Sequence, residues 1–418
     1  MAHLLMLEIP FDDDHGVVEG AARLGHRVTV VTAYADAAQT LRTALPGRDA
    51  SDTVVIEAYA YEALEAFALA LHARRPIDAV ICVLDVCIVD ASRLAERLGL
   101  RFLAAGTARL MRDKSLVRAR LADHGIEQPR FSLARSPDEL DAAIERIGWP
   151  CIVKPVDGFA SQWVTLLRDE PHWQKLRAAL RGAFASPGEL GTSGEWRGPW
   201  LVESFAHGTM VGCDTFTVGG RHIMLGVNEK MFFAPPSFAV RGGCFPSSRF
   251  DMEPIGRYVS DVLDALGFDF GAAHTEISIT CEGPRLIEVN PRLVGSGIPK
   301  LLGLALDRSL YEDLIALHLG SPMTELGDAR PVRFAASRWI TAPRNGVLRT
   351  LAPPEHIDPR VRRIALLHKP GDLVSLPYNN GNRLGCVMAV GATQEEAEQV
   401  AEQVVRDTRV EVDPEVQA

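Results

Sequence analysis

The sequence predicts a multidomain protein in which an α/β unit is followed by α+β units, and three observations lead to this class. The chain has 418 residues, which is enough for two to four domains of about 100–200 residues each. Apolar residues make up 47% of the chain and charged residues 23%, as is ordinary for a globular protein. Strand-length apolar runs alternate with helical stretches at first, whereas hairpin patterns dominate later.

Residues 1–105 are expected to form an α/β domain with a parallel sheet. Helical patterns, such as the one at 91–100, separate its strand-length runs, and parallel strands need such crossover connections. The predicted strands lie at 3–10, 26–32, 54–58 and 78–84. The unit contains no GxGxxG motif, so the sequence gives no sign of a dinucleotide-binding domain.

Residues 106–321 are expected to form a central domain, with a smaller part at about 135–205. A first helix is predicted over 108–125. A second is predicted over 136–148, because Ser136 can cap it and Pro137 suits the first helical position. The remaining predictions are strands at 151–156, 163–167 and 200–206, a mobile loop at 185–199, and a hairpin over 214–230 that turns at Gly219 and Gly220.

Residues 322–418 are expected to form a small C-terminal α+β domain. Strand patterns occur at 333–342 and 386–392, and an acidic helical pattern follows the second of them.

The charge balance and the cysteines indicate which classes of partner and which cellular compartment to expect. The chain has 44 basic and 54 acidic residues, so its net charge is −10, which disfavours nucleic acids and anionic membranes as partners. The start lacks a basic signal-peptide region, and no apolar run is long enough to span a membrane. The seven cysteines are scattered and form no CxxC pair, as expected for reduced thiols. We therefore expect a cytoplasmic protein, with a homodimer as the default assembly.

The stretch from 274 to 297 carries the clearest chemical pattern. Two strands joined by a short turn place Glu288 and Asn290 on one face, and a three-residue turn at 282–284 would put Glu276 opposite Asn290. Neighbouring carboxylates repel each other unless a proton or cation lies between them, and oxygen ligands without His or Cys favour Mg²⁺. The alternative is that both glutamates face solvent on a half-buried hairpin.

Two lysines suggest an anion site. Lys154 lies in an apolar strand, CIVKPV, where a buried ammonium needs an anionic partner such as a phosphate, and Gly158 and Ser161 follow in a loop that could add donors. Lys114 follows Asp113 in a helical stretch. The alternatives are that Lys154 extends to solvent and that Lys114 belongs to an exposed helix face.

Taken together, these residues resemble the ATP-grasp superfamily along the whole of residues 1–418. The resemblance is strongest in four segments that occur in the family's order, and it implies an ATP-grasp fold preceded by a parallel α/β pre-ATP-grasp domain. The segments are GTARLMRDKSLVRARLADHGIEQPRF (106–131), CIVKPVDGFASQWV (151–164), WLVESFAHG (200–208) and TEISITCEGPRLIEVNPR (275–292). Two departures are Ala160 and Trp163 at glycine-prone positions of the lid loop, and Met210 in place of an acidic residue after the hinge.

The resemblance also implies roles for individual residues. ATP would be bound by Lys114, Lys154, Ser161, Glu203, Phe205, Ala206 and Asp214. Two Mg²⁺ ions, which Mn²⁺ could replace, would be held by Glu276, Glu288 and Asn290. Arg292 and Lys230 would face the reacting phosphate.

Residues 290–315 are similar to the branch of the superfamily that contains L-amino-acid (dipeptide) ligases and carnosine-synthase-like enzymes. That similarity implies a substrate site formed by Arg249, Gly295, Ser296 and Gly297. It implies a ligase that joins a small carboxylate to an amine, both expected to be amino acids, through an acyl phosphate, with release of ADP and phosphate. The alternatives are a biotin-carboxylase-like enzyme, a purine-pathway ligase, and a nucleotide-binding regulatory protein without turnover.

Overall fold

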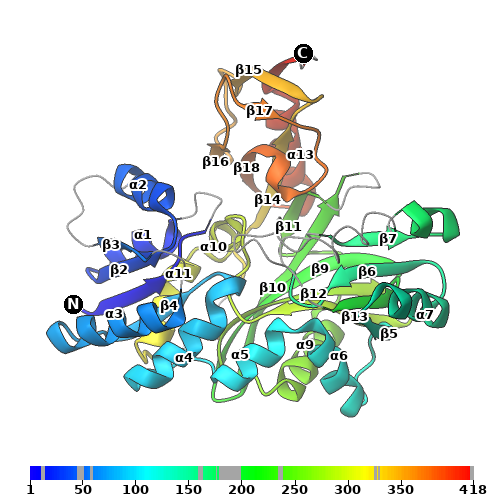
Figure 1. The fold of residues 1–418 in the computed structure, drawn as a ribbon. Helices are drawn as coiled ribbons and strands as arrows, with labels where there is room; N and C mark the ends of the chain where they lie inside the picture. Colours follow the sequence, from blue (N-terminus) through cyan, green and yellow to red (C-terminus); the bar gives the residue numbers. More distant parts are fainter. Residues whose placement is uncertain are drawn as a thin grey trace.

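The computed structural model describes residues 1–10, 15–44, 51–56, 60–158, 163–175, 177, 199–233, 239–323, 327 and 330–414. The predicted loop at 185–199 lies almost wholly outside these residues, as do Ala160 and Ser161. Figure 1 shows the N-terminal sheet, the large central sheet and the C-terminal strands arranged around a middle region that contains α10 (Ile298–Leu306).

The first domain contains the predicted parallel sheet, whose strand order is β3-β2-β1-β4. Its strands are β1 (His3–Leu7), β2 (Arg27–Thr32), β3 (Ser51–Val55) and β4 (Ala79–Cys82), and its helices are α1 (Gly16–Arg23), α2 (Ala35–Ala44), α3 (Tyr61–Arg74) and α4 (Ile88–Leu98). The strand order reverses between β1 and β4. The carboxyl edge at such a reversal is where open α/β sheets bind ligands.

The centre of the molecule is an eight-stranded sheet with the order β13-β12-β9-β10-β11-β14-β18-β16. Its strands are β9 (Gly208–Val218), β10 (Arg221–Phe232), β11 (Val240–Phe245), β12 (Phe270–Thr280), β13 (Gly283–Asn290), β14 (Phe334–Thr341), β16 (Val361–Leu366) and β18 (Arg383–Gly391). The β9–β10 hairpin turns at Gly219 and Gly220, as predicted, and both glycines have positive φ. Because β11 pairs with β14, the expected domain boundary near residue 321 does not coincide with an end of this sheet.

Helices cover the large sheet and join it to the first domain. Val259 and Val262 of α9 (Met252–Ala265) pack with Val211, Val227 and Ile277 in one buried cluster. A second cluster contains apolar residues of β1 and β4, of α10 and α11 (Leu310–His318), and of the large sheet. The N-terminal domain and the large sheet therefore share a core.

A smaller sheet, with the order β5-β8-β6-β7, lies beside the large one. Its strands are β5 (Phe131–Ala134), β6 (Cys151–Pro155), β7 (Thr165–Leu167) and β8 (Trp200–Ser204). The helix α7 (Pro137–Ile147) packs on it, and the Ser136 hydroxyl accepts the Glu139 N–H at 3.2 Å, which confirms the predicted N-cap.

The predicted single helix over 108–125 is wrong. The structure has two helices, α5 (Ala105–Arg112) and α6 (Lys114–Asp123). Asp113 adopts an extended conformation between them, and its carboxylate accepts the N–H groups of Ser115 and Leu116. Asp113 is thus the N-cap of the second helix, and the break places Lys114 in the first turn of α6.

The predicted register of the 274–297 hairpin is also wrong. The turn has two residues, Cys281 and Glu282, between the paired Thr280 and Gly283, and a β-bulge follows Glu276. As a result Glu276 lies opposite Glu288, and His274 lies opposite Asn290. The predicted shared face of Glu288 and Asn290 is present.

The C-terminal part adds β14, β16 and β18 to the large sheet and a three-stranded sheet of β17 (Leu373–Val374), β15 (Gly346–Ala352) and β19 (Arg409–Pro414). The predicted acidic helix is α13 (Gln394–Asp407), whose apolar side packs on β14 and β18.

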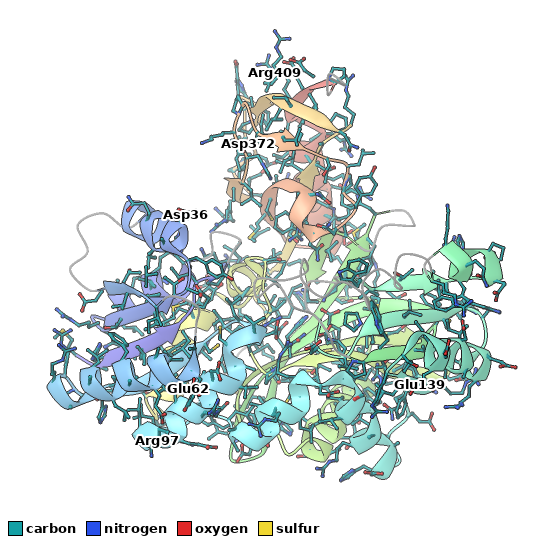
Figure 2. The ribbon with its side chains drawn as sticks, in the orientation of Figure 1. Asp36, Glu62, Arg97, Glu139, Asp372 and Arg409 are labelled. Carbon is teal, nitrogen blue, oxygen red and sulfur yellow. The ribbon has the colours of Figure 1, made fainter. Side chains whose placement is uncertain are left out.

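Many charged side chains lie on the surface of the molecule, although several others are buried. Figure 2 labels three of the exposed ones, Glu62 of α3, Arg97 of α4 and Glu139 of α7. No disulfide joins any of the seven cysteines, of which six are buried, as expected for reduced thiols. In the part of the chain that the structure describes, no helix has both the length and the apolar character to cross a membrane.

Candidate functional site

A cavity of about 770 Å³ lies where the N-terminal sheet, the large sheet and the C-terminal strands meet. This volume is within the usual range of small-molecule sites, about 300–1,000 Å³. The residues after β4 form one wall, and strands of the large sheet form another. Its polar lining includes Asp85, Lys230, His274, Glu276, Glu288, Asn290, Arg292 and Arg383.

The facing carboxylates of Glu276 and Glu288 are each paired with a lysine. Lys230 Nζ lies 2.5 Å from Glu276 Oε1, and Lys114 Nζ lies 3.0 Å from Glu288 Oε1. Burial raises the pKa of Glu276, but Lys230 and His274 outweigh burial and hold this pKa well below its ordinary value. Both carboxylates therefore need positive charge beside them, and the lysines supply it.

Asn290 connects this pair to Asp85 and Arg292. Its side-chain amide, turned so that the nitrogen donates, lies 3.1 Å from Asp85 Oδ1 and 3.3 Å from Glu288 Oε1. Arg292 donates to Asp85 through Nη2 and to the Leu293 carbonyl through Nη1. Burial lowers the pKa of Arg292, but the Asp85 carboxylate outweighs burial and the net shift is upward. Arg292 is thus a permanently charged group held in one orientation.

These residues fit a hard divalent cation. Glu276, Glu288 and Asn290 supply two carboxylates and one amide oxygen on the cavity side of two adjacent strands, which is the donor set that Mg²⁺ prefers. If the Asn290 amide is turned the other way, its oxygen faces the oxygens of Asp85 and Glu288, an arrangement that a cation would stabilise. Among the described residues, no group of three His, Cys, Asp or Glu side chains is arranged to hold a metal.

His274 is a neighbour of this cluster that the sequence analysis missed. Its Nδ1 lies 3.0 Å from Asp214 Oδ1, and its Nε2 lies 3.2 Å from Lys230 Nζ. A Cβ atom on Gly212 would lie 2.6 Å from His274 Cε1, so only glycine leaves room for this contact. Asp214 is 1% exposed and bonded to His274, so its position does not support the nucleotide contact expected of it. His274 could have been found from the sequence, because it lies two residues before Glu276 in the same strand and therefore on the same face.

Lys154 is buried, as predicted, but its partner in the structure is a glutamate. Lys154 Nζ lies 2.7 Å from Glu203 Oε2, and Arg118 Nε lies 2.7 Å from Glu203 Oε1. Burial raises the pKa of Glu203, but the two cations outweigh burial and bring this pKa down to about 2. Lys154 and Arg118 also donate to the Ile287 carbonyl of β13. The three charges therefore tie the small sheet and α6 to the β12–β13 hairpin.

Phe205 and Ala206 lie in the short link between β8 of the small sheet and β9 of the large sheet. The Phe205 N–H donates to the Pro150 carbonyl, and the Ala206 carbonyl accepts the Ser278 hydroxyl at 3.1 Å. The backbone of this link is therefore held from both sides. Glu203 lies in β8, two residues before Phe205, and its carboxylate is bound to Arg118 and Lys154.

The predicted substrate residues fall into two groups. Gly295 and Ser296 line the cavity, and Gly297 next to them caps the N-terminus of α10 with φ of 67°. Arg249 is not among the described lining residues, and its guanidinium pairs with Glu229 at 2.5 Å and Glu398 at 3.4 Å. Arg249 thus links its segment to α13, and its predicted substrate contact stays a prediction.

Asp85 and Arg383 line the cavity although the sequence analysis did not select them. Asp85 lies three residues after the end of β4, at the carboxyl edge of the parallel sheet. Because ligands bind at this edge in open α/β sheets, its position in the sequence could have marked it as a site residue. Arg383 begins β18, and nothing in its local sequence distinguishes it from the other arginines.

Comparison with known families matches three segments of the chain. Residues 18–101 match an ATP-grasp N-terminal domain, residues 147–300 match an ATP-grasp domain, and residues 338–413 match the second C-terminal domain of L-amino acid ligases.

Individual relatives agree with these matches. An uncharacterised Sinorhizobium fredii protein, y4rH, is 30% identical over 72% of this chain and 61% of its own length. Human carnosine synthase 1 is 27% identical over 52% of this chain and 28% of its own length. The chain thus spans under two thirds of either relative. The crystal structure of an L-amino acid ligase from Bacillus licheniformis superposes with a TM-score of 0.82 at 21% identity, covering 99% of both chains, which establishes the shared fold.

Proposed function

We propose that this chain, which belongs to the ATP-grasp superfamily, is a ligase that joins a carboxylate to an amine with the conversion of ATP to ADP and phosphate. Its substrates are amino acids or similar small molecules. The observation that carries the proposal is the cavity lined by Lys230, Arg292 and the Glu276–Glu288 pair, with Lys114 bound to Glu288. The match of residues 338–413 to an L-amino acid ligase domain favours this branch over the carboxylase and purine alternatives.

The cations bind and orient the triphosphate. Lys114 is paired with Glu288, and Arg292 interacts electrostatically with both Glu288 and Glu276. Lys154, on the small sheet, donates to the carbonyl of Ile287, the residue before Glu288. A fixed cation neutralises charge on a transferring phosphoryl group without reorganising during the reaction. The link of Phe205 and Ala206 would contact the base through backbone groups other than the Phe205 N–H and the Ala206 carbonyl, which already bond to Pro150 and Ser278. Mg²⁺ at Glu276, Glu288 and Asn290 would supply further neutralisation of the phosphate charge.

The reaction then needs no protein nucleophile. A substrate carboxylate oxygen attacks the γ-phosphorus, the bond between that phosphorus and the β–γ bridging oxygen breaks, and ADP leaves as an acyl phosphate forms. The amine of the second substrate attacks the acyl carbon, a C–N bond replaces the C–O bond, phosphate leaves and the amine loses its proton. Lys230 and Arg292 stabilise the negative charge that develops on the phosphoryl oxygens.

A coupled assay tests the proposal. ADP release is measured with ATP, Mg²⁺ and pairs of amino acids, and the products are identified by mass spectrometry. We expect ADP release that requires a particular pair and yields one amide. The variant Arg292→Ala should lose at least 100-fold in turnover, whereas Arg257→Ala, which removes an exposed arginine, should behave as wild type. Wild-type turnover in Arg292→Ala, or no ADP release with any pair, would contradict the proposal.

A further inference from the structure

Three polar side chains on neighbouring strands of the large sheet connect the protein core to the cavity. They are Asp214 of β9, His274 of β12 and Lys230 of β10. His274 lies opposite Asp214 in the pairing of β9 with β12, and its Nδ1 lies 3.0 Å from Asp214 Oδ1. On the other side of the ring, Nε2 lies 3.2 Å from Lys230 Nζ. His274 and Lys230 line the cavity, and the buried Asp214 is bonded to the first of them.

The contact between His274 and Lys230 crosses a strand. In the sheet β9 lies between β12 and β10, so the two side chains come from strands that are not paired with each other. They meet over Gly212 of β9, where an added Cβ would lie 2.6 Å from His274 Cε1 and 3.4 Å from Lys230 Cε. The glycine therefore leaves the space in which the imidazole and the lysine meet.

Asp214 is a costly residue to bury at this position. It is 1% exposed, and among the described residues its second oxygen, Oδ2, has no hydrogen-bond partner. Its neighbours along the strand, Cys213 and Thr215, are buried as well. A buried carboxylate with an unpaired oxygen destabilises the fold, so stability alone would favour an apolar residue here. The carboxylate therefore needs an explanation other than packing.

The Asp214 carboxylate determines which nitrogen of His274 carries the proton. A carboxylate only accepts, so its hydrogen bond requires a proton on Nδ1. A lysine ammonium only donates, so its hydrogen bond requires a lone pair on Nε2. The imidazole with its proton on Nδ1 satisfies both contacts, and Asp214 favours that form. Together with Glu276, whose Oε1 lies 2.5 Å from Lys230 Nζ, the imidazole then holds the ammonium from two sides.

We infer that Asp214 is a positioning residue for the ligase reaction, which fixes His274 in the form and orientation that hold the Lys230 ammonium beside the reacting phosphate. This inference rests on the proposed function, in which Lys230 stabilises negative charge on the phosphoryl oxygens. That charge develops in the transition state, so a misplaced ammonium should lower kcat and leave the KM of ATP nearly unchanged. Asp214 itself acts only through its neighbour.

Two substitutions of Asp214 provide the first test, in the ADP assay with the amino acids that wild type uses. Leucine has a similar shape and no acceptor, so Asp214→Leu should lower kcat by about tenfold or more, with the KM of ATP within about threefold. Asparagine can turn its carbonyl oxygen toward Nδ1, so Asp214→Asn should restore most of the loss. The matched control is Asp264→Asn, which changes a carboxylate 3.2 Å from His222 of the same sheet and should behave as wild type.

A double-mutant cycle separates positioning from a general loss of structure. Lys230→Met removes the ammonium and should lower kcat by about 100-fold or more. If Asp214 acts through Lys230, then adding Asp214→Leu to Lys230→Met should change kcat by no more than about twofold. A merely structural role of Asp214 would lower kcat by the same factor in both backgrounds.

The inference and the proposed function can fail separately. Wild-type kcat in Asp214→Leu, or equal factors in the two backgrounds, would overturn the inference, although the ligase function would stand. If Asp214→Leu does not fold, His274→Gln and His274→Leu make the same comparison one contact closer to Lys230. The glutamine amide oxygen can still accept from the ammonium and leucine cannot, so equal kcat values would overturn the inference. If wild type releases no ADP with any pair of amino acids, the proposed function fails and the inference fails with it.

Discussion

Glu276 on β12 lies directly opposite Glu288 on β13, and each carboxylate is paired with a lysine from a distant part of the chain. Like charges in facing positions of a sheet destabilise it unless a countercharge is present. The two carboxylates therefore repel each other. Lys230 and Lys114 offset this repulsion, and a divalent cation bound between the carboxylates would reduce it further. Such a pair does not favour the stability of the sheet, but it is well suited to binding the cation of a metal nucleotide.

Replacing one member of this pair should separate function from folding. We expect Glu288→Gln to lower turnover by at least 100-fold, because the neutral amide removes a proposed metal ligand and the partner of Lys114. The free energy of unfolding should stay level or rise slightly, since the repulsion with Glu276 is gone. ADP release and urea unfolding measure the two effects. The matched control is Glu282→Gln in the turn of the same hairpin, an exposed position where activity should be unchanged. Full activity in Glu288→Gln would remove this residue from the site.

A single added methyl group should disturb the same cluster from the neighbouring strand. In Gly212→Ala the new Cβ would lie 2.6 Å from His274 Cε1 and 3.4 Å from Lys230 Cε, so the imidazole must shift and its contact with Lys230 is disturbed. We expect turnover to fall at least tenfold, because the Lys230 ammonium loses its fixed position.

Gly106→Ala is the matched control for that change. Gly106 lies in α5, and nothing is within 4 Å of its added Cβ. Alanine there should leave turnover unchanged and stabilise the protein by about 0.5–1 kcal/mol, because alanine is the better helix former. Equal activity of the two variants in the ADP assay would show that the His274–Lys230 contact is dispensable.

The sequence predicted the local part of this site and not its long-range partners. The alternation of a strand is enough to put Glu288 and Asn290 on one face, and the structure confirms it. The alignment of Glu276 depended on the turn length and on a bulge, neither of which has a clear sequence signal, so the predicted register was wrong.

The partners of the buried charges could not be predicted for a related reason. Lys154 was expected to need an anion, which is correct, but the anion is Glu203 from the adjacent strand, joined by Arg118 from α6. Asp85 and Arg292 are 207 residues apart in the sequence and meet only because the N-terminal sheet docks beside the hairpin. Such pairings are set by how elements pack, which propensity and periodicity do not encode.

The Glu203 triad should be a major contributor to stability. Glu203→Gln would leave Lys154 and Arg118 without their shared carboxylate, and one uncompensated buried charge costs about 3–5 kcal/mol. Urea unfolding should show a loss of about that size. The matched control, Glu253→Gln, removes an exposed pair with Arg257 and should change the free energy of unfolding by less than about 0.5 kcal/mol. A loss of under about 1 kcal/mol in Glu203→Gln would show that the two cations find other partners.

The buried imidazole of His318 should make stability depend on pH. Its ring lies 5.1 Å from the rings of Phe102 and of Phe270, and burial lowers its pKa from 6.5 to about 4. The unfolded chain therefore binds a proton below pH 6.5 that the folded protein does not take up until about pH 4. The stability that His318 contributes is complete above pH 6.5 and is lost as the pH falls through this window.

The two pKa values differ by about 2.5 units, which corresponds to a loss of about 3 kcal/mol in the free energy of unfolding between pH 6.5 and 4. His318→Gln removes the titrating group, so its unfolding free energy should fall less over this interval than that of wild type, by about that amount. Urea unfolding at a series of pH values gives the two slopes. His124→Gln, at an exposed position, should keep the wild-type slope. Parallel slopes for wild type and His318→Gln would show that another group governs the acid sensitivity.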